Sequence, residues 1–120
     1  MNEIKLNLKN DRYRKERGGQ AEFLSISCSV CENPIMLYQK DGVGRLKRCY
    51  LNRIFAPRKL ELLQYDANFL KSSDLPPLKC QECNSLIGVS MKYRDGRLAY
   101  RLVPGSIKKV RGVLDIFLIK

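Results

Sequence analysis

Apolar and polar residues alternate with a period of two in several short stretches of the chain, and this pattern predicts mostly β structure. The clearest stretches are residues 3–9 (EIKLNLK), 21–27 (AEFLSIS) and 113–120 (VLDIFLIK). They predict an opening strand, a strand that leads into Cys28 and a closing strand. Helix-compatible spacing is confined to residues 56–74, where Leu60 and Leu63 predict at most one short helix.

Two Asp-Gly pairs predict β-hairpins. DGVG at 41–44 lies between two β-rich runs, and RDGR at 94–97 lies between two more. Asp-Gly favours a two-residue type I′ turn, because both central residues of that turn need positive φ. In both halves of the chain the order is CxxC, strand, Asp-Gly, Arg-Leu and strand, which suggests an internal repeat. The alternative is that any CxxC-hairpin unit has this order.

The N-terminal stretch differs from the rest. Residues 10–20 (NDRYRKERGGQ) are charged, contain glycine and have no periodicity, which predicts a loop or mobile arm. We therefore expect a strand plus a basic arm over residues 1–20 and a single β domain over residues 21–120. A chain of 120 residues fits one domain.

Four of the five cysteines form two CxxC pairs, Cys28 with Cys31 and Cys80 with Cys83. Two such pairs supply the four thiolates of a tetrahedral zinc site. All four ligand positions would be filled by protein, so this zinc would be structural rather than catalytic. The sequence therefore predicts one structural zinc ion.

Other uses of the cysteines are less well supported. A redox pair usually opens a helix, whereas each CxxC here leads into a predicted strand. Disulfides are rare in reducing compartments, and iron–sulfur ligation remains an alternative. Cys49 stands alone in a predicted strand. It is interpreted as a small buried hydrophobic residue, with a reactive thiol beside Lys47, Arg48 and Arg53 as the alternative.

The pattern of strand, CxxC, hairpin, long insertion and KCQECNSLIGVSMKY (residues 79–93) resembles the Yippee-like and related β-tent zinc domains. The resemblance covers about residues 21–103 and rests on Cys28, Cys31, Cys80, Cys83 and the following Leu86, Ile87 and Gly88. It implies a mostly β fold in which two antiparallel sheets are pinned by a four-cysteine zinc site. Among similar domains, the C-terminal domains of RNA-sensing helicases bind RNA through lysines. Methionine sulfoxide reductase activity is not supported, because no cysteine follows Cys83 and the chain has no histidine.

The absence of histidine also excludes Ser-His-Asp and Cys-His catalysis and histidine-liganded catalytic zinc. The protein is therefore expected not to be an enzyme and to have no small-molecule substrate. The longest apolar run is too short to cross a membrane, and the N-terminus lacks the apolar segment of a targeting signal. We expect a cytoplasmic protein with no membrane partner.

Positive charge suggests the partner. Lysine and arginine number 23 against 12 acids, a net charge of +11. The excess lies in residues 40–59 and 80–112, each with seven basic residues, so a polyanion is the expected partner. Tyrosines fall in the same segments and could stack on bases. The alternative is that the tyrosines pack between strands and the basic residues form a solvated sheet face.

The sequence thus predicts a protein that binds nucleic acid, RNA in preference to DNA, and a ribonucleoprotein such as the ribosome is the expected setting. The alternative is a protein–protein adaptor of the Yippee-like type. The predicted nucleic-acid contacts are Arg12, Arg14, Lys15, Arg17, Arg45, Lys47, Arg48, Arg53, Arg58, Lys59, Arg94, Arg97, Arg101, Lys108, Lys109 and Arg111.

Overall fold

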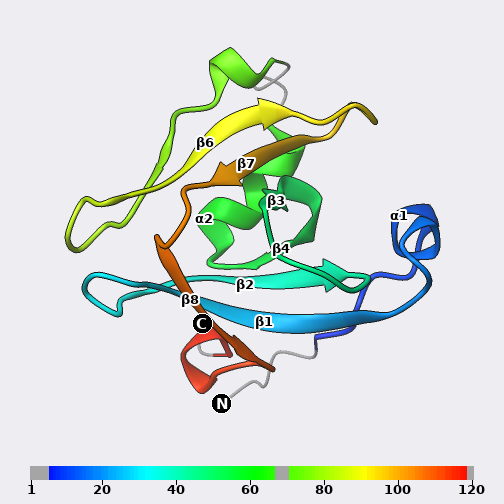
Figure 1. Ribbon diagram of the computed structural model, residues 1–120, viewed down its shortest axis with the longest axis horizontal. Helices are drawn as coiled ribbons and strands as arrows, with labels where there is room; N and C mark the ends of the chain where they lie inside the picture. The colour runs from blue at the N-terminus through cyan, green and yellow to red at the C-terminus, as the bar shows by residue number, and fades with distance from the viewer. Residues whose placement is uncertain (1–5, 67–70, 119–120) are drawn as a thin grey trace.

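The computed structural model describes residues 6–66 and 71–118, and within these residues two antiparallel four-stranded sheets lie one above the other (Figure 1). The first sheet has the order β4-β2-β1-β8, with bounds Ile54–Ala56, Pro34–Asp41, Ala21–Cys28 and Ile107–Arg111. The second has the order β3-β7-β6-β5, with bounds Arg48–Tyr50, Leu98–Leu102, Leu86–Lys92 and Leu78–Lys79. This confirms the predicted fold class.

Helices are short. The α-helices are α1 (Arg12–Glu16) and α2 (Arg58–Glu61), and the 3₁₀ turns are η1 (Leu51–Arg53), η2 (Leu62–Tyr65), η3 (Ser72–Asp74) and η4 (Asp115–Phe117). The helix α2 lies in the segment predicted to hold one short helix. No helix in residues 6–66 and 71–118 is long and apolar enough to cross a membrane.

The hydrophobic core lies between the two sheets. Ile26 and Met36 of the first sheet are fully buried, as are Cys49 and Ile87 of the second. Strand β2 is buried along most of its length, since η4 contacts it as well. Burial of these strands on the inner faces gives both sheets a fixed register.

The N-terminal stretch is not a free arm. Asp11 begins α1 by accepting hydrogen bonds at Oδ1 from the backbone N–H groups of Tyr13 and Arg14, the usual role of an N-cap carboxylate. The helix is then held against the sheets by side-chain contacts described below. The prediction of a loop or mobile arm at residues 10–20 was therefore wrong.

The terminal strands were also mispredicted. Of the predicted opening strand at 3–9, residues 1–5 lie outside the described residues, and Leu6 to Lys9 form no strand. The predicted closing strand at 113–120 instead contains η4, with residues 119–120 outside the described part. The last strand, β8, lies earlier, where Lys108 and Lys109 break the apolar alternation.

One of the two predicted hairpins is confirmed. Strands β6 and β7 pair across the RDGR turn, in which Tyr93 N–H donates to the carbonyl of Arg97. The turn has three residues rather than two, because this bond leaves residues 94–96 between the strands, and of these three only Gly96 has positive φ. This is a type I turn followed by a left-handed residue.

The DGVG segment does not close a hairpin. Strand β2 pairs with β1 and β4, whereas β3 pairs with β7 in the other sheet. The loop between β2 and β3 thus crosses from one sheet to the other. Gly42 has φ +78°, and a Cβ there would lie 2.8 Å from the carbonyl oxygen of Arg17, so glycine lets the N-terminal segment approach this loop.

Candidate metal centre and basic pocket

Each CxxC pair forms the turn of an antiparallel strand pair, β1–β2 for the first and β5–β6 for the second. Glu32 N–H donates to the carbonyl of Cys28 across 2.9 Å, and Asn84 N–H donates to that of Cys80 across 2.8 Å. Glu32 and Asn84 both adopt positive φ, 65° and 63°. The two turns therefore have the same backbone design, and this is the part of the suggested internal repeat that the structure reproduces.

The two turns bring four sulfurs together. All four Sγ atoms lie within 4.8 Å of one another. Cys28 Sγ is 3.6 Å from Cys83 Sγ, and Cys31 Sγ is 3.5 Å from Cys80 Sγ. Four thiolates around a zinc ion, with Zn–S of about 2.3 Å, lie about 3.8 Å apart, so the cluster fits zinc. The site joins the end of β1 in one sheet to the end of β5 in the other.

Polar neighbours favour the thiolate form of Cys80 and Cys83 in this cluster. The Ser85 hydroxyl and backbone N–H lower the pKa of the Cys83 thiol to about 6, and backbone N–H groups lower the pKa of Cys80. At Cys31 the Asn33 N–H lowers the pKa, but desolvation and hydrogen bonds to the other sulfurs outweigh it and raise the pKa to about 12. A bound zinc ion would replace the protons that the four sulfurs otherwise share.

Cys49 belongs to no such cluster. It is fully buried in β3, and burial raises the pKa of its thiol far above the ordinary range. A thiol that stays protonated and inaccessible is a packing residue.

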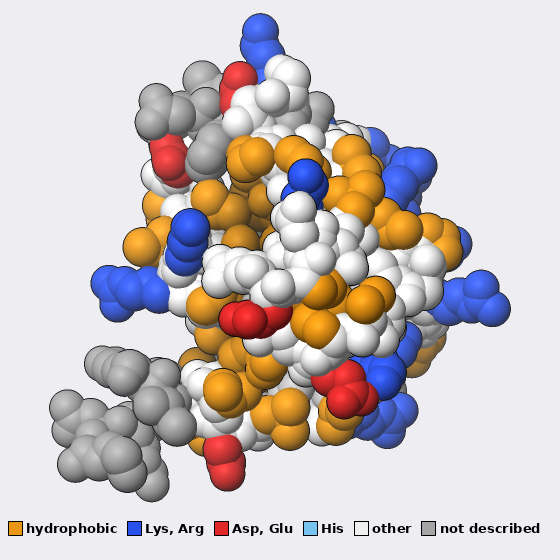
Figure 2. Space-filling view, turned by 90° about the vertical axis from the view of Figure 1, so that its left-hand side faces the viewer, with side chains coloured by type: hydrophobic (Ala, Val, Ile, Leu, Met, Phe, Trp, Pro, Cys, Tyr) orange, Lys and Arg blue, Asp and Glu red, His pale blue; other side chains and the backbone are white. Residues whose placement is uncertain are grey.

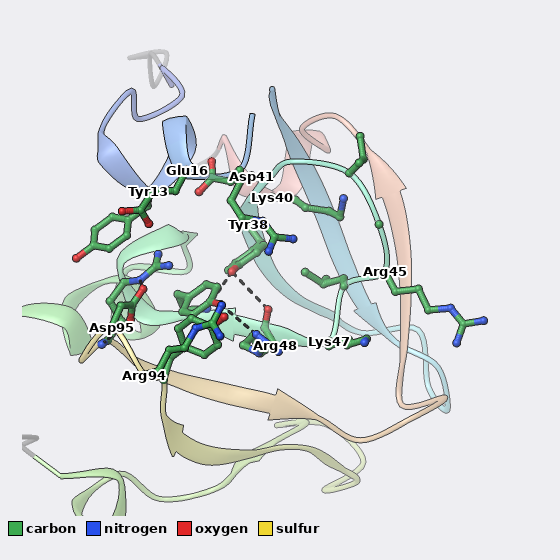
Figure 3. Close-up of a pocket in the computed structure, with 17 residues that line it drawn as sticks. Tyr13, Glu16, Tyr38, Lys40, Asp41, Arg45, Lys47, Arg48, Arg94 and Asp95 are labelled. Carbon is green, nitrogen blue, oxygen red and sulfur yellow. Dashed lines mark hydrogen bonds and ion pairs between the residues drawn. The ribbon is translucent and has the colours of Figure 1, made fainter. Parts of the chain in front are cut away.

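A pocket of about 490 Å³ lies beside α1 and the β6–β7 turn, which in Figure 1 are at the opposite side of the molecule from the CxxC turns. We call it the tyrosine–arginine pocket. Figure 3 shows its walls, contributed by α1, the loop after β2, strand β3 and the β6–β7 turn. It is lined by Tyr13, Glu16, Arg17, Tyr38, Lys40, Asp41, Val43, Gly44, Arg45, Leu46, Lys47, Arg48, Tyr50, Tyr93, Arg94, Asp95 and Arg97.

Stacked rings and guanidinium groups form one wall of this pocket. The guanidinium of Arg97 lies 3.7 Å from the ring centroids of both Tyr13 and Tyr50. Tyr50 in turn meets Tyr93 edge to face, with centroids 5.4 Å apart. Arg48 lies 4.6 Å from the Tyr93 ring and Arg94 lies 5.3 Å from it. Cation–π contacts of this kind hold the rings in fixed positions.

The pocket carries excess positive charge. Seven of its lining residues are basic and three are acidic. Asp41 and Asp95 already bind Arg53 and Arg97, across 2.7 Å and 2.9 Å. In the described part of the chain, Lys40, Lys47 and Arg48 have no carboxylate partner within 4 Å. These cations are available to an anionic ligand.

A second depression, the basic groove, adjoins the pocket. Its volume is about 780 Å³, and it shares Lys40, Val43 and Gly44 with the pocket. It is lined by Arg14, Gly19, Gln20, Ala21, Glu22, Leu24, Lys40, Gly42, Val43, Gly44, Lys109 and Arg111. Pocket and groove thus form one continuous surface on either side of the loop after β2.

The structure brings together nine of the predicted basic residues. Those that line the pocket or the groove are Arg14, Arg17, Arg45, Lys47, Arg48, Arg94, Arg97, Lys109 and Arg111. They come from α1 and its following loop, the loop after β2, β3, the β6–β7 turn and β8. Arg45 points away from the pocket centre in Figure 3.

The other predicted residues lie elsewhere. Arg58 and Lys59 are exposed on α2, Arg101 is exposed on β7, and Lys108 is paired with Glu32 at 2.8 Å. Arg12 and Lys15 are exposed on α1 but line neither depression.

The prediction that Arg53 contacts nucleic acid was wrong. Its side chain is fully buried and binds two carboxylates, Asp41 and Asp11, so it cannot contact a phosphate. A cation that loses its water on burial needs such partners. Its position in the η1 turn, after a basic hairpin-like stretch, made it look like a surface residue.

Two residues that line the pocket, Tyr13 and Lys40, were not predicted as site residues. Tyr13 was counted as part of a charged arm, and its place against Arg97 depends on how α1 docks, which no local pattern reveals. Lys40 was recognised as basic but not as a site residue, although it joins the pocket to the groove. Tyr38 and Tyr100, in contrast, are almost fully buried and support the packing interpretation for those two rings.

Comparisons with known protein families, with curated proteins and with solved structures found no match. What is established is a mostly β protein with four cysteines arranged to hold a metal ion, compatible with zinc.

Proposed function

We propose that this protein is a structural-zinc protein that binds single-stranded nucleic acid, RNA in preference to DNA, and that it catalyses no reaction. The observation that carries the proposal is the tyrosine–arginine pocket with the adjoining basic groove. Their cations that have no carboxylate partner suit phosphates, and their rings suit bases.

In this proposal the zinc ion supports binding by holding the two sheets together. The four sulfurs join the two sheets at one end of the molecule, while the pocket lies at the other (Figure 1). With four protein ligands, zinc would leave no open coordination position for a substrate. The role of the metal is therefore to fix the angle between sheets whose far ends carry the pocket walls.

The layout of two antiparallel sheets joined at a four-cysteine cluster also supports the proposed resemblance to β-tent zinc domains. RNA-binding domains are found among proteins of that shape. Fold analogy alone does not assign function, so the proposal depends on the pocket. Association with a ribonucleoprotein in the cytoplasm would be consistent with a small basic RNA-binding protein.

The test is the affinity of the zinc-loaded, full-length protein for a short single-stranded oligouridine, measured by fluorescence anisotropy across a salt series. The logarithm of the association constant should fall linearly with the logarithm of salt, with a slope of about −0.7 for each phosphate contact. The ratio of this affinity to the affinity for a deoxyuridine oligonucleotide of the same length measures the preference for RNA. Absent binding, or binding that salt does not change, would refute the proposal.

A protein adaptor remains the second candidate, because the face with the CxxC turns is partly apolar. Figure 2 shows hydrophobic side chains in several patches on this face, with few lysines or arginines between them. Val30, inside the first CxxC turn, is 69% exposed, and Leu86, three residues after Cys83, is 41% exposed. Loss of a copurifying protein in a Val30→Ser, Leu86→Ser variant that still binds oligouridine would favour this function.

A further inference from the structure

We propose that the tyrosine–arginine pocket holds the base of one unpaired nucleotide, stacked on the ring of Tyr93, while the basic groove holds the phosphates that follow. This inference rests on the proposed function and names the part of the nucleic acid that the pocket takes.

The size of the pocket suits one nucleotide. Pockets that hold a small organic molecule are roughly 300–1,000 Å³, and this one is about 490 Å³. It is bounded by α1 on one side and by the β6–β7 turn on another, as Figure 3 shows. A base in a duplex is stacked on both sides and cannot enter such a recess, whereas an unpaired base can.

Tyr93 is the ring best placed to stack with a base. Tyr13 and Tyr50 each have the Arg97 guanidinium only 3.7 Å from the ring centroid. The guanidinium groups nearest Tyr93 lie farther from its ring, at 4.6 Å and 5.3 Å. Tyr93 is half-buried and is held by the edge-to-face contact with Tyr50 and by Arg48 at 4.6 Å. Its other neighbour, Arg94, is exposed at the tip of the turn.

Arg94 does not block the ring. It is the first residue of a three-residue turn, forms no ion pair in the described part of the chain and lies 5.3 Å from the Tyr93 ring. Its side chain can therefore leave the ring or cover the outer face of an inserted base, and guanidinium planes stack on bases as aromatic rings do.

The phosphates have a continuous path. Lys40 borders both the pocket and the groove, and its Nζ donates to the carbonyl of Gly42 in the loop between them. On the far side of that loop Arg14 and Lys109 line the groove. A strand with one base in the pocket can thus place its next phosphates along the groove, where most of the charge neutralisation would take place.

The probe for this inference is a short abasic ribose-phosphate strand that carries one base, a 2-aminopurine, whose fluorescence is quenched when it stacks on an aromatic ring. Binding of the full-length zinc protein should quench it. Replacing the 2-aminopurine by an abasic nucleotide should weaken binding about tenfold, the loss expected for one stacked base. Because the abasic comparison uses the wild-type protein, it does not depend on the folding of any variant.

Three variants complete the test. Tyr93→Ala should weaken binding of the intact oligonucleotide about tenfold and abolish quenching, whereas Tyr93→Phe, which keeps the ring, should bind like the wild type. Tyr65→Ala removes a tyrosine that is 71% exposed and lines neither the pocket nor the groove. It should change neither the affinity for the oligonucleotide nor the quenching.

The outcomes separate the two proposals. If the oligonucleotide binds but the abasic version and Tyr93→Ala bind equally well, the base pocket is overturned and nucleic-acid binding stands. If no oligonucleotide binds, both are overturned. Equal affinity for a deoxyribose version, with equal quenching, supports the base pocket and overturns the preference for RNA.

Discussion

The Nη2 atom of Arg53 donates to Oδ1 of Asp11 across 2.6 Å, so a fully buried guanidinium holds the N-terminal segment against the sheets. The same guanidinium donates from Nε to Oδ2 of Asp41, at the end of β2. Gln39 adds a second attachment, since its side-chain amide both accepts from the backbone N–H of Lys9 and donates to the Lys9 carbonyl. These contacts position α1, and with it the Tyr13 wall of the pocket.

Replacement of Arg53 should therefore be costly. Arg53→Ala leaves Asp41, whose side chain is only 8% exposed, without its cation, and we expect a loss of about 3–5 kcal/mol in the free energy of unfolding. Urea unfolding of the zinc-loaded protein measures it. Arg111→Ala is the matched control, because Arg111 pairs with Glu22 at 3.4 Å but is 87% exposed. Equal effects of the two variants would contradict the structural role of Arg53.

Acid should weaken the attachment of α1. The hydrogen bond from Arg53 lowers the pKa of Asp11 from 3.8 to about 2. A carboxyl whose pKa is lower in the folded state contributes stability above its unfolded pKa and loses that contribution as pH falls toward the folded value. The stability gap between wild type and Asp11→Asn should therefore narrow as pH falls below about 4.

This pH dependence can be followed by urea unfolding at each pH at which both proteins remain folded. Both proteins are measured with zinc bound, over the acid range in which the zinc-loaded fold persists, so that loss of the metal does not enter the comparison. A gap that stays constant as pH falls below about 4 within that range would show that Asp11 is not a partner of Arg53 in solution.

Removal of the metal should unfold the protein. Structural zinc contributes an apparent ~10–16 kcal/mol at neutral pH, which is as large as the whole stability of a small domain. We expect one zinc per chain by metal analysis, and loss of both zinc and the β-rich circular dichroism signal in Cys80→Ser or after chelation. A metal-free protein that keeps its fold would contradict the assignment of the cysteine cluster.

Cys49 should be unreactive in the folded protein. Burial raises the pKa of its thiol, so neither the thiolate nor access is available at neutral pH. Peptide mapping after treatment with iodoacetamide should find Cys49 unmodified in the zinc-loaded protein and modified after unfolding in urea. Rapid modification in the folded state would contradict the packing role and favour the alternative that Cys49 is a reactive thiol.

The parts of the structure that follow from local sequence were predictable. The period-two pattern at 21–27 is β1, and two CxxC turns at the ends of strand pairs give the cysteine cluster. The RDGR hairpin was predictable as well, although Gly96 alone takes positive φ. In the strand and in each turn, neighbours in the sequence determine the conformation, and the repeated CxxC spacing identifies the four residues of the cluster.

The parts that were mispredicted depend on contacts between distant segments. Strand β3 could have paired with β2 in a hairpin or crossed to the other sheet. It crosses because β7, about fifty residues later in the chain, takes β3 as its partner. Likewise, a charged N-terminal stretch looks mobile until Arg53 and Gln39 supply buried partners for it. Charge count alone could not separate Arg53 from Lys47, one buried and one exposed.

The most direct test of the central claim compares the salt dependence of RNA binding in two double variants. Lys40→Gln, Lys47→Gln removes two cations of the tyrosine–arginine pocket, and Lys59→Gln, Lys71→Gln removes two exposed lysines outside the pocket and the groove. For a single-stranded oligouridine, the first variant should bind more weakly and its salt slope should be shallower by about 1.4, whereas the second should keep the wild-type slope. Equal slopes in the two variants would contradict the claim that this pocket and groove bind RNA.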